Sequence, residues 1–272
     1  MKRNHLFHAV IAGGIALAGQ SAHAQLVPPV ESVEVNLAGL AVGGVPDYMG
    51  SSHNKGAAGP MLRYQFEGSK RYFLWLGPQM QLNLIDDEEW RAGPYLNFRS
   101  GRGTDVDDAV VKQMVGINNT VEGGAFVQYN MKLSSAKFHQ LVFSGDLAGG
   151  SNGTVGHLRM MWWQPLREGT ILNLGLGTTI ANDKWMQTYF GVNNPHDIGL
   201  YPSLGGLPFN AGSGVSGVNI PFGITQMLSR EWLVSVGGRY EKLQGDAKDS
   251  PVVSQRGDSN QWVIGAGLSY MF

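Results

Sequence analysis

Few side chains in this sequence have the types and spacing needed for acid–base or nucleophilic chemistry. The chain of 272 residues contains seven histidines, and those beyond residue 24 are His53, His139, His157 and His196. No H-E-x-x-H pattern, the helical signature of many zinc hydrolases, accompanies them. We interpret His139 and His157 as members of strands, where a histidine facing a barrel lumen or a membrane interface is commoner than a catalytic base.

His53 and His196 are the better candidates, because each lies in a polar loop with an aspartate nearby. A Ser-His-Asp set could be drawn from the loop residues Asp47, Ser51, Ser52 and Asp197. In such a set the histidine takes the hydroxyl proton of the serine, which requires the three groups to be in contact. Nothing in the sequence brings them together, so we predict no catalytic residue. A lipid- or peptide-modifying barrel enzyme ranks last among the functions considered.

Three acidic loops provide oxygen atoms of the kind that Ca²⁺ prefers. They contain Asp86, Asp87, Glu88 and Glu89; Asp105, Asp107 and Asp108; and Asp246 and Asp249. None has the EF-hand spacing, so we interpret them as solvated loops and predict no metal and no cofactor. The run Met160 to Trp163 (MMWW) suggests a platform for a sugar or peptide, but an aromatic girdle at a membrane interface explains it more simply.

Composition narrows the class of protein. Cysteine is absent, which excludes a disulfide scaffold and a thiolate zinc site. The chain has 39 glycines together with 7 Trp, 9 Tyr and 11 Phe, a combination that favours many strands and turns over collagen or a disordered chain. The net charge is -1 and no basic patch occurs, so we expect no nucleic acid as partner.

Residues 1–24 predict a secretory signal peptide. MKRNH is a basic start, Ala9 to Gly19 is a short apolar run, and Ala22-His23-Ala24 is an A-x-A cleavage site. We expect the mature chain to begin at Gln25 and residues 25–272 to form one domain. No stretch of about 20 apolar residues follows that could span a membrane as a helix. If this chain crosses a membrane, it does so as strands.

A period of two, which is the alternation of a β-strand, runs through most of the remaining chain. One segment recurs three times, as Gly59 to Phe66 (GPMLRYQF), Gly77 to Leu84 (GPQMQLNL) and Gly93 to Ser100 (GPYLNFRS). In each copy the even-numbered residues are apolar and the odd-numbered residues are mostly polar. The closing residues, NQWVIGAGLSYMF, place Trp262 and every second residue to Phe272 on one apolar face.

Eleven strands can be counted in this way. The further strong runs are Ala125 to Met131, Leu172 to Ile180, Val218 to Ile224 and Trp232 to Glu241, and the weaker runs are Ser32 to Val42, His139 to Leu147 and Val155 to Trp163. Bacterial single-chain barrels have an even number of strands. We expect twelve, with the missing strand near Arg102 to Thr120 or between Asp183 and Ser213, and ten is the alternative.

The alternation fits either a secreted β-sandwich or a membrane barrel. The runs are longer than most globular strands, and a dry sandwich core would have to bury Arg63, Arg91, Arg99 and Arg239, each with a partner. In a polar lumen we expect these arginines to need no partner. We therefore predict an all-β fold, a transmembrane antiparallel up-and-down β-barrel whose outer face contacts lipid. An aromatic-rich last strand ending at Phe272 resembles the signal read by the barrel-assembly machinery.

Four stretches resemble the MltA-interacting protein family, also called MipA/OmpV. They are Val45 to His53 (VPDYMGSSH), Lys184 to Val192 (KWMQTYFGV), Leu243 to Val253 (LQGDAKDSPVV) and Ser259 to Phe272. The resemblance implies a β-barrel in the outer membrane of a Gram-negative cell. It also implies that the protein is a non-enzymatic scaffold for murein enzymes, because some members assemble a lytic transglycosylase and a bifunctional murein synthase.

The alternative to a scaffold is a small passive diffusion pore. Twelve strands tilted by about 40° would leave a lumen roughly 10 Å wide after the inward side chains are subtracted. Glycines at several positions of the predicted inner face would keep part of this lumen open. They are Gly175, Gly177, Gly223, Gly237, Gly265 and Gly267.

Overall fold

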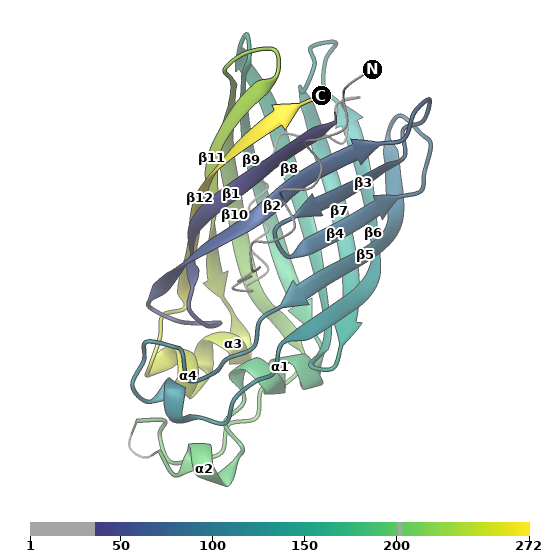
Figure 1. Ribbon diagram of the computed structural model, residues 1–272. Coiled ribbons are helices and arrows are strands. Elements are labelled where there is room, and N and C mark those ends of the chain that lie inside the picture. The colour runs from purple at the N-terminus through teal and green to yellow at the C-terminus, as the bar shows by residue number, and fades with distance from the viewer. Residues whose placement is uncertain (1–35, 201–202) are drawn as a thin grey trace, which may run out of the picture.

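The computed structural model describes residues 36–200 and 203–272, and within them the chain forms a closed antiparallel β-barrel of twelve strands (Figure 1). Each strand pairs with its neighbours in sequence, and β1 closes the barrel against β12, with Leu37 opposite Met271. The predicted fold class and the count of twelve are therefore confirmed. The predicted signal peptide and the first residues of the run from Ser32 lie outside the described residues.

The strands range from 5 to 15 residues in length. They are β1 (Leu37–Pro46), β2 (Asn54–Gln65), β3 (Tyr72–Leu76), β4 (Gln79–Asn83), β5 (Trp90–Arg99), β6 (Thr120–Lys132), β7 (Gln140–Gly150), β8 (Gly153–Arg167), β9 (Thr170–Ala181), β10 (Gly214–Met227), β11 (Trp232–Leu243) and β12 (Asn260–Met271).

The period of two in the sequence is the alternation between the wall and the lumen. In β12, Trp262, Ile264 and Leu268 are about half exposed on the outside, whereas Gln261 and Ser269 are buried inside. The three copies of the repeated segment fall on β2, β4 and β5 with their apolar residues outward. The alternation in the sequence predicts the two faces correctly because successive side chains of a strand point to opposite faces.

The strand that the sequence count missed is β3, and both expected locations were wrong. Residues 102–119, 183–200 and 203–213 form loops and short helices, whereas β3 lies at Tyr72–Leu76 (YFLWL) between two strands that the pattern did predict. Its lumen-facing residues, Tyr72 and Leu74, are as apolar as its outward ones and are buried. A five-residue strand that is apolar on both faces shows no period of two, so alternation could not reveal it.

The two ends of the barrel differ in the length of their connections. β1 begins and β12 ends at one end, which we call the turn end; its connections are residues 66–71, 84–89, 133–139, 168–169 and 228–231 (Figure 1). At the opposite end, residues 47–53, 100–119, 182–200, 203–213 and 244–259 fold together as a cap. The cap contains η2 (Val111–Gln113), α1 (Asp183–Phe190), α2 (Pro195–Ile198), α3 (Gly245–Asp249) and α4 (Pro251–Ser254).

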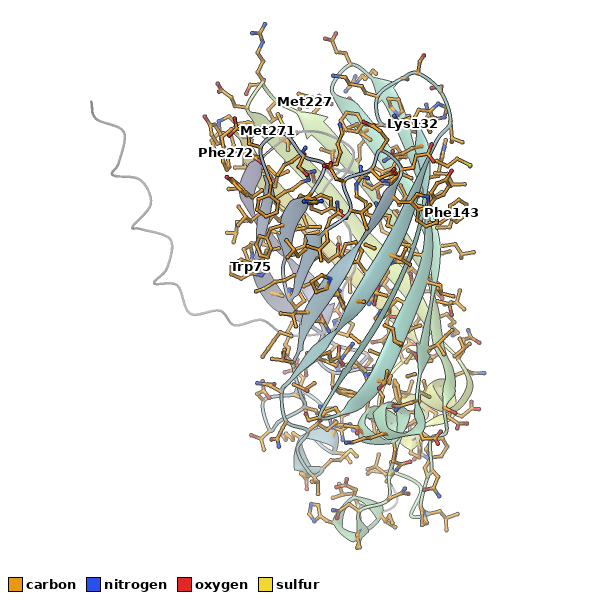
Figure 2. The ribbon with its side chains drawn as sticks, turned by 90° about the vertical axis from the view of Figure 1, so that its right-hand side faces the viewer. Trp75, Lys132, Phe143, Met227, Met271 and Phe272 are labelled. Atoms are coloured by element: carbon orange, nitrogen blue, oxygen red, sulfur yellow. The ribbon has the colours of Figure 1, made fainter. Side chains whose placement is uncertain are left out.

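The outer wall carries an apolar belt with aromatic residues toward both ends. The rings of Trp90 and Tyr129, and those of Trp232 and Tyr270, contact each other toward the turn end. Tyr240 contacts Trp262 toward the cap. Phe143 and Trp75 project from the outside of the barrel in Figure 2. Such a belt between two aromatic girdles is the surface that outer-membrane barrels present to lipid.

Among the described residues, no helix combines the length and the apolar character needed to cross a membrane.

Candidate functional site: the capped end of the lumen

Within the cap, helix α1 closes the end of the barrel. Asn182 caps its N-terminus by accepting a hydrogen bond from the amide of Trp185 at 3.0 Å, a bond that satisfies one of the free N–H groups of the first turn. Trp185, Met186 and Phe190 then pack with the lumen-facing Val155 and other barrel residues in one buried apolar cluster. The amphipathic helix thus turns its apolar face into the mouth of the lumen.

A buried ion pair lies directly under α1. Arg99 donates from Nε to Oε1 of Glu122 at 2.6 Å and from Nη2 to Oε2 at 2.9 Å, and Asn97 donates to the same carboxylate at 2.7 Å. The guanidinium of Arg99 also lies 5.2 Å from the ring centre of Trp185, in cation–π geometry. Strands β5 and β6 therefore hold a bidentate pair that contacts the helix above it.

Two further clusters of charged side chains face the lumen near the Arg99–Glu122 pair. Asp146 contacts Nδ1 of His157 at 2.7 Å through one oxygen and Nη2 of Arg159 at 2.6 Å through the other. Arg239 pairs with Glu241 at 3.1 Å. Since a buried charge needs a partner and hydrogen bonds, each acid here neutralises a basic side chain on its own or a neighbouring strand.

The predicted lumen arginines are therefore inside the barrel, but the expectation that they need no partner was wrong. Arg99 and Arg239 have carboxylates, and Arg63 donates to Gln65 and lies 4.6 Å from the ring centre of Tyr72. Arg91 donates to the backbone oxygens of Asp87 and Trp90. All four side chains are buried, and protein groups act as partners of their charges.

The space left between α1 and these charges is small. A cavity lined by Arg99, His157, Trp185 and Arg239 among others has a volume of about 30 Å³, room for about two water molecules. Nearer the turn end, one inward cluster contains Leu37, Met61 and Leu233, and another contains Val142, Met161, Trp163 and Ile171. Among the described residues, the cavity between α1 and these charges is too small for a solute much larger than water.

Four of the six glycines expected to keep the lumen open, Gly175, Gly177, Gly223 and Gly267, instead lie against neighbouring atoms. A Cβ atom added to Gly175 would meet the sulfur of Met161 and lie 3.1 Å from Cγ of Pro221, and one added to Gly177 would lie 2.7 Å from Oδ1 of Asn219. Larger neighbouring side chains already occupy the space beside these glycines. At these positions glycine permits close packing rather than an open channel.

The histidines and aspartates considered as a catalytic set do not come together. Asp47 accepts a hydrogen bond from the amide of Asp107 and pairs with Lys55 at 3.3 Å, and Asp197 accepts from the amide of Val115. His53 contacts Ser52 at 3.3 Å on the exposed surface, and His196 contacts the backbone oxygen of Gln113. Both carboxylates serve to hold loops of the cap to one another.

Ser151 belongs to a segment, GGSNG (149–153), that matches the G-x-S-x-G spacing of a nucleophile elbow. In α/β-hydrolases that motif joins a strand to a helix. Here it is the tight turn between antiparallel β7 and β8, and the hydroxyl of Ser151 donates to Oγ1 of Thr120 at 2.9 Å. This serine therefore stabilises a turn.

The other residues singled out in the sequence have structural surroundings. His157 lies in a strand, as predicted, and faces the lumen, whereas the strand prediction for His139 was wrong: it contacts Ser134 in an exposed turn before β7. The MMWW run divides across the wall: Met160 and Trp162 face outward, whereas Met161 and Trp163 are buried in the lumen, so only half of it joins the girdle. Within the described residues, no group of three or more His, Asp or Glu side chains is arranged to hold a metal ion.

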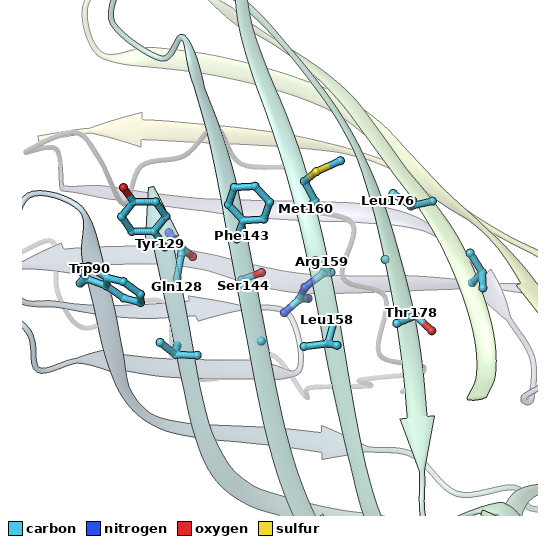
Figure 3. A pocket seen from close by; sticks show the side chains of 14 residues that line it. Trp90, Gln128, Tyr129, Phe143, Ser144, Leu158, Arg159, Met160, Leu176 and Thr178 are labelled. Carbon is cyan, nitrogen blue, oxygen red and sulfur yellow. The ribbon is translucent and has the colours of Figure 1, made fainter. Parts of the chain in front are cut away.

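A groove on the outer wall is a further hollow of the described chain. It has a volume of about 680 Å³ across β5 to β10, and Gly145 lies in its floor. Figure 3 shows Trp90, Tyr129, Phe143, Met160 and Leu176 around it, and these come from five neighbouring strands. Because most of its lining residues belong to the outward apolar belt, the groove faces the membrane rather than a polar ligand.

The sequence analysis did not identify the acidic residues that pair with the arginines of the lumen, nor one buried arginine of the cap. Glu122, Asp146 and Glu241 are single charges on the polar faces of strands, and a polar residue at an inward position was the available signal. Arg102 lies in the β5–β6 loop, is 6% exposed, and was not distinguishable from a surface arginine. Its burial depends on cap segments that are distant in sequence.

Solved structures with a similar chain path share little sequence with this protein. A NanC porin matches at a TM-score of 0.45 with 9% identity, covering 87% of this chain and 98% of that one. OmpT, an outer membrane protein of Vibrio cholerae, matches at 0.35 with 8% identity, covering 88% and 97%. A Pseudomonas aeruginosa FadL homologue matches at 0.36 with 9% identity, covering 92% and 94%.

No curated protein sequence matches the chain. The family described as "MltA-interacting protein MipA" does, over residues 38–272, a range that includes all twelve strands except the first residue of β1. The sequence resemblance, the twelve-strand closed barrel and this match agree. The chain belongs to the MltA-interacting protein MipA family and is a β-barrel of the outer membrane.

Proposed function

We propose that this protein is a non-enzymatic interaction protein that links the outer membrane to murein enzymes. The barrel is the anchor, and a lytic transglycosylase and a bifunctional murein synthase are the partners. The observation that carries the proposal is the family match over nearly all of the described chain, since the description of that family names an interaction with MltA. The closed lumen adds support, because it leaves little room for a transport role.

The turn end is the surface that we assign to these partners. Outer-membrane barrels have short periplasmic turns and longer extracellular loops, and murein lies in the periplasm. By this rule residues 66–71, 84–89 and 133–139 face the murein enzymes, whereas the cap faces outward.

A cluster of charged side chains gives the turn end a defined chemistry. Glu88 contacts Lys70 at 3.1 Å and Lys132 at 3.4 Å, which lowers the pKa of its carboxyl. The pKa of Asp86 is also lowered, chiefly because Asp86 accepts a hydrogen bond from the amide of Lys70. The 84–89 turn therefore presents ionised carboxylates in fixed positions, a surface that suits a partner with basic side chains.

The apolar belt and the last strand account for the other partners that we propose. Lipid of the outer membrane would cover the belt and fill the groove of Figure 3. Phe272 is 60% exposed, and its amide donates to the backbone oxygen of Asn36 at 3.0 Å. An aromatic side chain at the end of the closing strand is available to the barrel-assembly machinery before β12 pairs with β1.

Capture from solubilised cell envelopes tests the proposal. Immobilised wild-type protein should retain a lytic transglycosylase and a bifunctional murein synthase. A double variant, Asp86→Lys with Glu88→Lys, reverses the charge of the turn, so we expect it to retain much less of both. A matched control, Lys184→Glu, reverses a charge on α1 in the cap and should leave capture unchanged. If the wild-type protein retained neither enzyme, the scaffold role would be wrong.

A further inference from the structure

The cap contains a polar hollow that neither the barrel nor the proposed scaffold role requires. It has a volume of about 340 Å³ and lies between the β5–β6 loop and the segment that contains α1 and α2. Its polar lining includes Arg102, Asn118, Asn152, Gln187, Thr188 and Asp197. This volume is in the range of small-molecule sites, and the lining is mostly polar, unlike that of the groove on the membrane face.

Arg102 is the unusual residue of this hollow. It is 6% exposed, and its buried Nε atom has no hydrogen-bond partner. Among the described residues Arg102 forms no ion pair; Asp197 is the carboxylate that acts on it most strongly, and one oxygen of Asp197 already accepts from the amide of Val115 at 2.8 Å. A buried guanidinium that lacks a hydrogen-bonded anion is costly. An anionic group placed in the hollow would remove that cost.

The carboxamides around Arg102 are held in fixed orientations. Asn152 donates to the backbone oxygen of Asn118 and to the hydroxyl of Tyr189, both at 3.0 Å, and Gln187 accepts from the amide of Ala211 at 3.0 Å. Amide and hydroxyl groups both donate and accept hydrogen bonds. A ligand rich in hydroxyl groups uses both capacities, and it needs little reorganisation from side chains that are already ordered.

We propose that this hollow binds an acidic saccharide on the extracellular side of the membrane. Arg102 pairs with the carboxylate or phosphate of the sugar, for which its planar fork is suited. The carboxamides, Thr188 and Asp197 take the ring hydroxyls. Since long loops of outer-membrane barrels face outward, the sugar is either free outside the cell or carried by a glycolipid of the outer leaflet. The proposal does not depend on the periplasmic scaffold role.

The test compares two sugars that differ in one group. Purified protein in detergent is titrated calorimetrically with D-glucuronate and with D-glucose, in which a CH₂OH group replaces the carboxylate. We expect glucuronate to bind about tenfold or more tightly, because hydrogen bonds between charged groups are stronger than neutral ones. Equal affinity for the two sugars, or no binding of either, would overturn the proposal. So would binding of inorganic phosphate without binding of either sugar.

Two pairs of variants locate the site. Arg102→Gln should abolish the preference for glucuronate, whereas Lys184→Gln, which removes the same charge from an exposed part of the cap, should keep it. Gly116→Leu places a side chain in the lining without removing a buried group, since a Cβ there would lie 3.4 Å from the oxygen of Arg102. It should weaken binding, and Gly116→Ala should not. Unchanged affinity in both Arg102→Gln and Gly116→Leu would place the binding elsewhere.

Reconstituted vesicles identify the source of the sugar. The same glucuronate titration is made with protein in phospholipid vesicles and in vesicles that also contain lipopolysaccharide. Weaker glucuronate binding in the second case means that a membrane glycolipid occupies the hollow, and unchanged binding means that the free sugar is the ligand.

Discussion

Several of the buried charges in this barrel form ion pairs, and the pair that contacts α1 matters most for the shape of the cap. Arg99 and Glu122 are both almost fully buried and joined by two hydrogen bonds, and the guanidinium also contacts Trp185 of α1. Removal of one member of a buried pair leaves the other charge without compensation. The position of α1 over the lumen is therefore coupled to a strand-to-strand ion pair.

Glu122→Gln should destabilise the protein by about 3 kcal/mol or more, because Arg99 would remain charged and buried. The free energy of unfolding in detergent can be followed through tryptophan fluorescence in denaturant. Glu88→Gln is the matched control: Glu88 is 63% exposed at the turn end, so its loss should change the free energy by under about 1 kcal/mol. Equal stability of the two variants would show that the buried pair does not hold the cap.

The Asp108–Arg256 pair should make the cap sensitive to acid. Burial favours the neutral form of Asp108, but its hydrogen bonds with Arg256 at 2.7 Å and with the amides of Val110 and Val111 prevail and lower its pKa. A carboxyl whose pKa is lower in the folded state stabilises that state above its unfolded pKa, and the contribution is lost as the pH falls through the folded value. Hydrogen exchange in residues 100–119 and 244–259, corrected for the intrinsic effect of pH, should therefore rise below about pH 4.

Asp108→Asn provides the control for this pH effect, because it removes the titrating group at nearly constant size. In that variant the exchange should already be faster at neutral pH and should change less on acidification. An acid response of the same size in Asp108→Asn would assign the effect to another group.

At the scale of elements, the sequence predicted strands wherever one face is polar. β2, β5 and β12 meet this condition, because their inward Arg63, Asn97 and Gln261 alternate with apolar residues. β3 does not, since Tyr72 and Leu74 face the lumen. The cap was not predictable by the same logic: Arg256 pairs with Asp108, which is 148 residues away in the chain, and Ser250 donates to the backbone oxygen of Phe190. Such contacts leave no local periodicity.

The candidate site, like the cap, was only partly predictable from local sequence patterns. The arginines of the lumen were predicted from their place on polar faces, but their partners and the burial of Arg102 depend on which loops meet. Neither propensity nor spacing carries that information, because tertiary contacts decide it.

The packing of the lumen gives a prediction at the scale of strands. Gly175→Leu should destabilise the barrel by about 1 to 3 kcal/mol, because the new side chain would collide with Met161, Pro221 and the backbone of Met160. Gly56→Leu, on the outer face of β2 where a Cβ meets nothing within 4 Å, is the control and should be tolerated. Denaturant unfolding of both variants measures the difference. A stable Gly175→Leu protein would mean that the lumen is open at β9.

At the scale of the whole molecule, the cap and the packed interior predict that the protein does not conduct. Folded wild-type protein inserted into a planar bilayer should show no single-channel steps. A variant in which residues 183–212 are replaced by a short Gly-Ser turn lacks α1, and it should leak if the cap is the main obstacle. Regular conductance steps in the wild type would favour the diffusion pore over the scaffold.

The central claim is that the outer wall of a closed twelve-strand barrel contacts membrane lipid, and the last strand tests it most directly. The chain has no cysteine, so single cysteines at positions 262 to 270 can each carry a nitroxide label in reconstituted protein. Collision with oxygen, which concentrates in lipid, should be high at outward Ile264, Ala266 and Leu268 and low at inward Val263, Gly267 and Ser269. If oxygen accessibility showed no alternation along β12, or if the outward positions collided mainly with a water-soluble relaxation agent, the membrane barrel would be contradicted.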